Sequence, residues 1–250
     1  MKTLVGNYLN KDEKKELLAS IREQKEFSEL ITAMKQHTEV DFKEDSVKIE
    51  RAFKFDLAHS ETVVSAKAMK VVFDENVHIH FITRYKNGNV DDTSSTIVGH
   101  IFSNEVDQDV TLHKIFSNSE GEIKIKVKEI PVEDVTTQED KFIEGFNFDE
   151  NYVPGQLVDQ VNSAGKDWLK DGCLPGGYIY CGGGCGGYPA CKSSVKGVNK
   201  LDDECCKYHD CCYAVNNDTG DKGCDAIICN CAKTYLDDYF GAIGVVAVFC

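Results

Sequence analysis

The chain has 250 residues, twelve cysteines and a formal net charge of −14. This charge argues against a nucleic-acid-binding protein, because phosphate contacts need a basic patch and the sequence shows none. The length suits either one large mixed domain or two smaller ones.

The positions of the cysteines divide the chain. All twelve lie between Cys173 and Cys250, and most of the acidic excess lies in the cysteine-free part before them. Zinc knuckles are disfavoured because no paired Cys-x-x-Cys motifs occur, and such cysteine density is typical of small secreted domains held by disulfides. We therefore expect a cysteine-free acidic domain with its linker over residues 1–151 and a disulfide-rich domain over residues 152–250.

The start of the chain, MKTLVGNYLNKDEKKELL, has no recognisable signal peptide because it lacks an apolar segment. The cysteines nevertheless indicate a protein that is secreted, or released at the surface after processing. A dedicated exporter, an upstream leader or oxidation after release would reconcile these two observations. The apolar segment 240–249 is too short to span a bilayer.

The cysteine-free part is predicted to be an α+β domain, with helices followed by an antiparallel β-meander. Residues 10–36 carry two apolar stripes that are out of phase, which predicts two short helices or a kink. From about residue 40 to 130, apolar residues recur with period two, with hairpin turns expected at Asn87-Gly88 and Glu120-Gly121.

Two pairs of polar residues are predicted to lie at the surface. His78 and His80 share one face of a predicted strand with the spacing of metal ligands. Because no third ligand accompanies them, we expect plain surface, with metal binding as the less favoured alternative. Asp237 and Asp238 are likewise expected at a solvated edge.

The junction between the two parts has its own pattern. Residues 131–152 are acidic and aperiodic, which is typical of a linker that proteases can reach. After Pro154-Gly155, apolar residues from Leu157 to Leu169 predict a helix that ends at Gly172.

The segment LDDECCKYHDCCY, residues 201–213, holds the candidate catalytic residues. On a helix, His209 and Asp210 point in different directions, each with a cysteine one turn before it. The glycine-rich run upstream, YCGGGCGG at residues 180–187, can aim several carbonyl oxygens at one point, which suits calcium. A bridge from Cys181 to Cys206 would hold that loop one turn from Asp210, and His209 would then lie beside the ion as a general base.

These residues resemble the signature of secreted phospholipase A2 enzymes. The match consists of Tyr-Cys-Gly-x-Gly at 180–184 and Cys-Cys-x-x-His-Asp-x-Cys-Tyr at 205–213, within roughly residues 155–240. It implies a small, mainly α-helical disulfide-rich domain. It implies Ca²⁺ held by the carbonyls of Tyr180, Gly182 and Gly184 and by the carboxylate of Asp210.

The resemblance also implies the reaction. His209 would activate water against the sn-2 ester of a glycerophospholipid, and the amide of Gly182 would stabilise the oxyanion. Three features depart from the family's commonest pattern. Cys185 replaces a glycine, the connection 190–200 is longer, and Ala232 follows Cys229-Asn230-Cys231 where an aspartate usually orients the histidine.

Asp225 offers a substitute for the missing aspartate. It follows Cys224 directly and lies seven residues before Ala232, on the same helix face. A bridge from Cys212 to Cys224 would bring Asp225 to His209, whereas a bridge to Cys231 would bring Ala232. A turn centred near residue 218 favours the first pairing, and a turn extended to Gly223 lies between the two. Some divergent family members also place an aspartate soon after the histidine helix, so we predict Asp225.

Two functions are consistent with this sequence. The first is calcium-dependent hydrolysis of the sn-2 ester at a phospholipid membrane surface, with residues 1–151 as a pro-region, chaperone or intramolecular inhibitor. The alternative is a non-catalytic, disulfide-stapled toxin or bacteriocin-like module that disturbs membranes. Its support is Ala232 and the apolar end of the chain.

Overall fold

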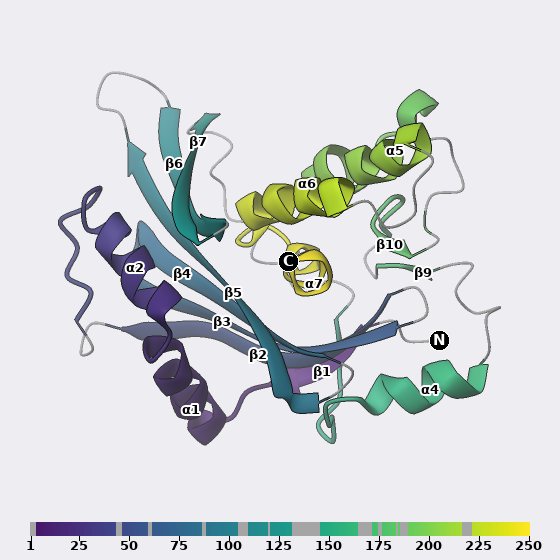
Figure 1. Cartoon of the computed structure of the whole chain (residues 1–250), viewed down its shortest axis with the longest axis horizontal. Helices are drawn as coiled ribbons and strands as arrows, with labels where there is room; N and C mark the ends of the chain where they lie inside the picture. The colour runs from purple at the N-terminus through teal and green to yellow at the C-terminus, as the bar shows by residue number, and fades with distance from the viewer. Residues whose placement is uncertain are drawn as a thin grey trace.

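The computed structural model describes residues 4–43, 47–59, 62–86, 89–104, 110–119, 121–131, 146–164, 172–174, 177–183, 185, 190–216 and 222–250. A strongly curved eight-stranded sheet crosses the molecule (Figure 1), in the order β7-β6-β5-β4-β3-β2-β1-β8. Its strands are β1 (Leu4–Tyr8), β2 (Lys48–His59), β3 (Thr62–Asp74), β4 (Val77–Lys86), β5 (Asn89–Asn104), β6 (Val110–Ser119), β7 (Glu122–Pro131) and β8 (Asn147–Phe148). The consecutive antiparallel strands β2–β7 confirm the predicted meander.

Two strands at one edge of the sheet were not predicted. β1 pairs antiparallel with β2, and β8 pairs in parallel with β1, so the chain returns to the sheet before the disulfide-rich region begins. The β6–β7 turn contains Gly121 at φ 85°, a conformation that favours glycine. The predicted turn at Asn87-Gly88 and most of the predicted linker lie outside the described residues.

Two short helices precede the meander, as predicted. α1 (Lys11–Arg22) begins with a capping box, in which the Asn10 side chain accepts from the Glu13 amide and the Glu13 carboxylate accepts from the Asn10 amide. α2 (Lys25–Met34) follows after a short turn. Their apolar faces bury Leu17, Ile21, Leu30 and Met34 against one face of the sheet.

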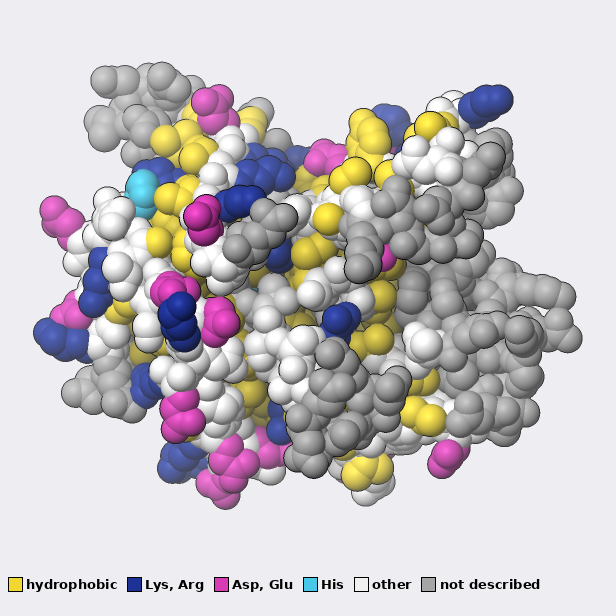
Figure 2. Space-filling view, viewed as in Figure 1, with side chains coloured by type: hydrophobic (Ala, Val, Ile, Leu, Met, Phe, Trp, Pro, Cys, Tyr) yellow, Lys and Arg dark blue, Asp and Glu magenta, His cyan; other side chains and the backbone are white. Residues whose placement is uncertain are grey.

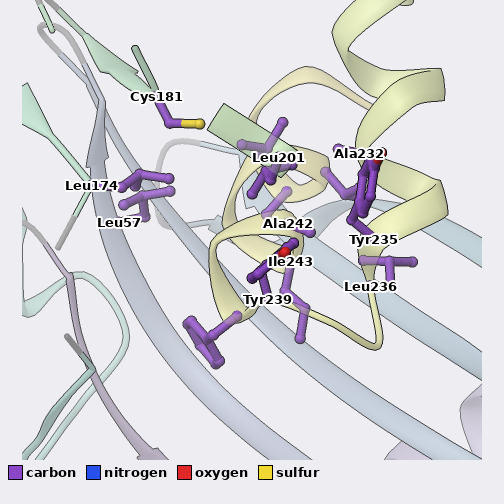
Figure 3. Close-up of a cluster of buried hydrophobic side chains, with 14 of the residues drawn as sticks. Leu57, Leu174, Cys181, Leu201, Ala232, Tyr235, Leu236, Tyr239, Ala242 and Ile243 are labelled. Atoms are coloured by element: carbon purple, nitrogen blue, oxygen red, sulfur yellow. The ribbon is translucent and has the colours of Figure 1, made fainter. Parts of the chain in front are cut away.

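The opposite face of the sheet holds the C-terminal region. The helical and strand segments of this region are α4 (Gln156–Ala164), β9 (Gly172–Cys173), β10 (Gly182–Gly183), η4 (Ala190–Lys192), η5 (Leu201–Cys206), α5 (Lys207–Asn216), α6 (Lys222–Ala232), η6 (Lys233–Tyr235) and α7 (Phe240–Phe249). The sheet and this region share one hydrophobic cluster, in which Leu57 of β2 joins Cys181 of the glycine-rich run and Ile243 of α7 (Figure 3). The mixed sheet with helices and the disulfide-rich C-terminal region agree with the expected α+β composition.

α7 explains the apolar end of the sequence. Nearly every residue of this helix is apolar, and residues on all its sides are buried, because α7 lies between the sheet and α6 (Figure 1). The Phe240 ring contacts Phe53 and Phe55 of β2 edge-on. At the other end, the Arg84 guanidinium of β4 donates to the Val248 carbonyl at 2.8 Å.

A buried aspartate attaches α4 to the sheet. Asp56 of β2 is fully buried and accepts hydrogen bonds from the Tyr152 hydroxyl and from the amides of Gly155 and Leu157. Its carboxylate therefore satisfies amides at the first turn of α4, the role of an N-cap supplied from another part of the chain. The predicted helix from 157 to 169 is described only to Ala164.

The face over α1, α2 and the sheet carries both signs of charge. Figure 2 shows acidic and basic side chains interspersed there, with hydrophobic side chains in narrow strips between them.

Candidate active site

Six disulfides hold the C-terminal region, and they use all twelve cysteines. The pairs are Cys173–Cys185, Cys181–Cys206, Cys191–Cys211, Cys205–Cys231, Cys212–Cys224 and Cys229–Cys250. Two of them decide the geometry of the candidate site. Cys181–Cys206 ties the glycine-rich run to the start of the histidine helix, and Cys212–Cys224 ties α5 to α6.

The candidate histidine lies on α5, which continues directly from the π-helical segment η5. Such π segments often occur at functional sites. His209 is only 6% exposed, and its ring packs edge-on against Tyr213 and against Phe249 of α7. These contacts fix the orientation of the imidazole.

Asp225, and not Ala232, contacts the imidazole. The His209 Nε2 atom lies 3.1 Å from the Asp225 Oδ1 atom, and the Tyr213 hydroxyl donates to the same oxygen. Ala232 is fully buried in the hydrophobic cluster. The arrangement follows from the Cys212–Cys224 disulfide, the pairing that the sequence favoured.

The contact with Asp225 has a consequence for the other ring nitrogen. A neutral imidazole that donates from Nε2 has its accepting lone pair on Nδ1. The His209 Nδ1 atom lies 3.8 Å from the Asp210 Oδ1 atom. The imidazole is therefore arranged to accept a proton on the side where Asp210 lies.

Asp210 is a partly buried carboxylate, with 29% of its side chain exposed. Burial raises its pKa, and the neighbouring His209 imidazole works in the opposite direction. Within the described part of the chain, no lysine or arginine forms an ion pair with it. A bound cation would offset this burial cost, so the carboxylate is suited to be a metal ligand.

The glycine-rich run is held in place by a second aspartate. Asp202, in η5, is fully buried and accepts from four backbone amides, those of Ile179, Tyr180, Cys181 and Val198, at 2.8–3.1 Å. The sequence pointed to its neighbours His209 and Asp210 but not to Asp202. One carboxylate within an acidic run of three gives no local signal that it will be buried.

Of the predicted calcium ligands in the glycine-rich run, the structure describes Tyr180 and Gly182 but not Gly184. Tyr180 and Gly182 belong to the run that Cys181–Cys206 joins to the helix carrying Asp210, with Cα atoms 5.0 Å apart at the disulfide. Gly182 adopts φ 133°, a conformation that L side chains rarely take. Calcium prefers oxygen ligands, and the backbone carbonyls and Asp210 supply only oxygen, so the residues present fit the ion.

Among the helices that the structure describes, none is both long enough and apolar enough to cross a bilayer. Comparison of the chain with protein-family models, curated proteins and solved structures found no match.

Proposed function

We propose that the protein hydrolyses the sn-2 ester of glycerophospholipids, with calcium as its cofactor. The observation that carries this proposal is the 3.1 Å contact between His209 Nε2 and Asp225, with Asp210 on the other side of the ring. A carboxylate that orients a buried imidazole is the arrangement of a general base. Together with the resemblance to secreted phospholipase A2 enzymes, it favours water-mediated ester hydrolysis.

His209 would carry the proton through the reaction. A water oxygen bonds to the sn-2 carbonyl carbon while its proton passes to His209 Nδ1. The imidazolium then gives this proton to the departing glycerol oxygen, which leaves a fatty acid and a lysophospholipid. Asp225 holds the reactive tautomer and stabilises the imidazolium, and the Tyr213 hydroxyl holds Asp225.

The oxyanion would be stabilised by the glycine-rich run. In the proposal the Gly182 amide donates to the carbonyl oxygen as negative charge develops on it. Tyr180, Gly182 and Asp210, with Gly184 from the sequence, would hold the calcium ion. When bound, the ion supplies positive charge beside the oxyanion.

We further propose that the sheet keeps the enzyme in a covered form. It buries α7, which is apolar on all sides and contacts His209 through Phe249. An apolar helix that is freed from such a cover would bind the surface of a membrane. The six disulfides are typical of proteins from oxidising environments, and we propose that the protein acts after secretion.

Calcium removal is the first test of the proposed function. The substrate is a phosphatidylcholine–phosphatidylglycerol vesicle with labelled fatty acid at the sn-2 position. We expect this fatty acid to be released in about 5 mM CaCl₂, a concentration above the dissociation constants of weak extracellular calcium sites, roughly 0.1–1 mM. Release should fall at least about 10²-fold when calcium is chelated, because the oxyanion loses its neighbouring charge. Vesicle leakage without fatty-acid release, unchanged by chelation, would contradict hydrolysis and support a non-catalytic membrane-active module.

Asp225→Ala tests the partner of the histidine. Without the carboxylate, the imidazole loses the bond that selects its tautomer, and we expect fatty-acid release to fall about 10²- to 10³-fold. Asn230→Ala is the matched control, because Asn230 is exposed on the same helix. Equal rates for the two variants would mean that Asp225 has no part in the reaction.

A further inference from the structure

Four buried histidines form a cluster on the face of the sheet that covers the C-terminal region. They are His78 and His80 of β4, His100 of β5 and His113 of β6, and none is more than 4% exposed. His78 and His80 are two residues apart, so their side chains share a face, and His100 lies directly opposite His78 in the strand register. The prediction that His78 and His80 lie at the surface is therefore wrong, because the C-terminal region covers them.

Asp237 supplies a third metal-ligating side chain next to His78 and His80, although it is distant from them in the sequence. It lies in the turn between η6 and α7, and its Oδ2 atom is 2.6 Å from His78 Nε2 while its Oδ1 atom is 3.0 Å from His80 Nε2. His100 Nδ1 is 3.8 Å from Asp237 Oδ2. Asp237 is thus not at a solvated edge, as predicted, but enclosed by imidazoles from the sheet. Asp238 is exposed, as predicted.

One buried nitrogen of the histidine cluster has no hydrogen-bond partner among the described residues. This atom is His100 Nε2. A buried polar nitrogen without a partner costs free energy, and natural proteins rarely leave one without a reason. The His100 ring borders the two histidines of β4, since its centroid is 5.1 Å from that of His78 and 5.2 Å from that of His80, and the His100 atom 3.8 Å from Asp237 is Nδ1.

We propose that His78, His80 and Asp237 bind a zinc ion. Two imidazole nitrogens with one carboxylate oxygen are a donor set of zinc proteins. Calcium is expected to bind this site weakly, because calcium prefers oxygen ligands and two of the three ligand atoms here are nitrogens. The site is independent of the proposed hydrolysis, since it shares no residue with the His209 site.

The three ligand atoms are close enough together for one ion. The ligand atoms of His78, His80 and Asp237 all lie within 4.8 Å of one another. Zinc bonds of about 2.0–2.2 Å in tetrahedral geometry separate ligand atoms by about 3.3 Å. The 2.6 and 3.0 Å contacts are hydrogen bonds, so binding replaces the Nε2 protons by the ion and lengthens these two contacts by about 0.7 and 0.3 Å.

The neighbours of the proposed ligands are suited to hold them in place. Lys70 Nζ lies 2.9 Å from Asp237 Oδ1. Metal-binding carboxylates and imidazoles usually have such outer hydrogen bonds, which orient them. The ligands come from the sheet and from the turn that precedes α7. Zinc at this site would therefore clamp the sheet onto the C-terminal region.

The experiment measures zinc on the oxidised 250-residue chain. The protein is stripped with a chelator, dialysed and titrated with ZnCl₂ against a chromophoric competitor. About 5 mM CaCl₂ is present to saturate sites made of oxygen ligands alone, because this concentration exceeds the dissociation constants of weak extracellular calcium sites, roughly 0.1–1 mM. We expect one zinc per chain. His80→Gln and Asp237→Asn should each weaken binding at least about 10²-fold, since even outer contacts of a metal site are worth about 10- to 100-fold. His37→Gln is the matched control, because His37 is exposed and outside the cluster.

A second measurement does not depend on the folding of any variant. X-ray absorption by the zinc-loaded wild-type protein should show imidazole scattering at a zinc–nitrogen distance of about 2.0 Å, without sulfur. The proposal is wrong if the wild-type protein retains no stoichiometric zinc, if the absorption spectrum lacks imidazole, or if His80→Gln binds as tightly as His37→Gln.

Discussion

His209→Gln is expected to lower fatty-acid release by about 10⁴-fold or more, the upper range for the loss of a general base. Glutamine can still donate a hydrogen bond toward Asp225, but it has no nitrogen that accepts a proton. The substitution therefore removes the proposed proton transfer and keeps much of the packing against Tyr213 and Phe249. Release of labelled fatty acid from vesicles in saturating calcium measures the effect.

The matched control for this variant is His37→Gln, which makes the same substitution at an exposed helix end. Both variants should bind vesicles like the wild-type protein, so a loss confined to His209→Gln would lie in the chemical step. If His209→Gln kept more than about a tenth of the wild-type rate, His209 could not be the general base, since that role is worth about 10² or more.

Asp202→Ala should destabilise the protein more than any other single truncation near the site. The substitution leaves four backbone amides without their acceptor, two of them in the glycine-rich run and one directly before it. A buried donor without a partner costs about 1–3 kcal/mol, and water can replace some of the lost bonds, so we expect a loss of at least about 3 kcal/mol. For a chain of this size, that loss lowers the melting temperature by roughly 6–12 °C.

Asp203→Ala is the control, because the neighbouring carboxylate accepts from only one backbone amide in the described part of the chain, that of Gly197. Its expected cost is about 1 kcal/mol. Differential scanning calorimetry with the disulfides intact compares the two variants. Calcium binding, followed by calorimetric titration, should weaken in Asp202→Ala alone, because the loop carbonyls lose their support. Equal melting temperatures would show that Asp202 does not hold the glycine-rich run.

Local patterns predicted those parts of the fold that depend on local interactions. The out-of-phase stripes predicted α1 and α2, and the period-two alternation predicted the meander, because each strand pairs with the next one in sequence. β1 and β8 were missed. β1 has only five residues, and β8, the edge strand, has two and pairs with β1 across more than 140 residues, so no local pattern marks either strand.

The same limit applies to the two sites. The turn centred near residue 218 and the resemblance to divergent family members favoured Asp225, and the Cys212–Cys224 disulfide is the pairing that this turn predicts. The acceptor role of Asp202 and the contact of Asp237 with His78 and His80 depend on segments that are distant in sequence. One strand with two histidines looks the same whether solvent or another part of the protein covers it.

The attachments between the sheet and the C-terminal region decide what a cut in the chain can achieve. Asp56 caps α4, Arg84 binds the last carbonyls of α7, and β8 pairs with β1 at the edge of the sheet. A break between residues 131 and 146 leaves all three attachments intact. Such a break would therefore produce a nicked, non-covalent heterodimer, and activation would need a separate dissociation step after proteolysis.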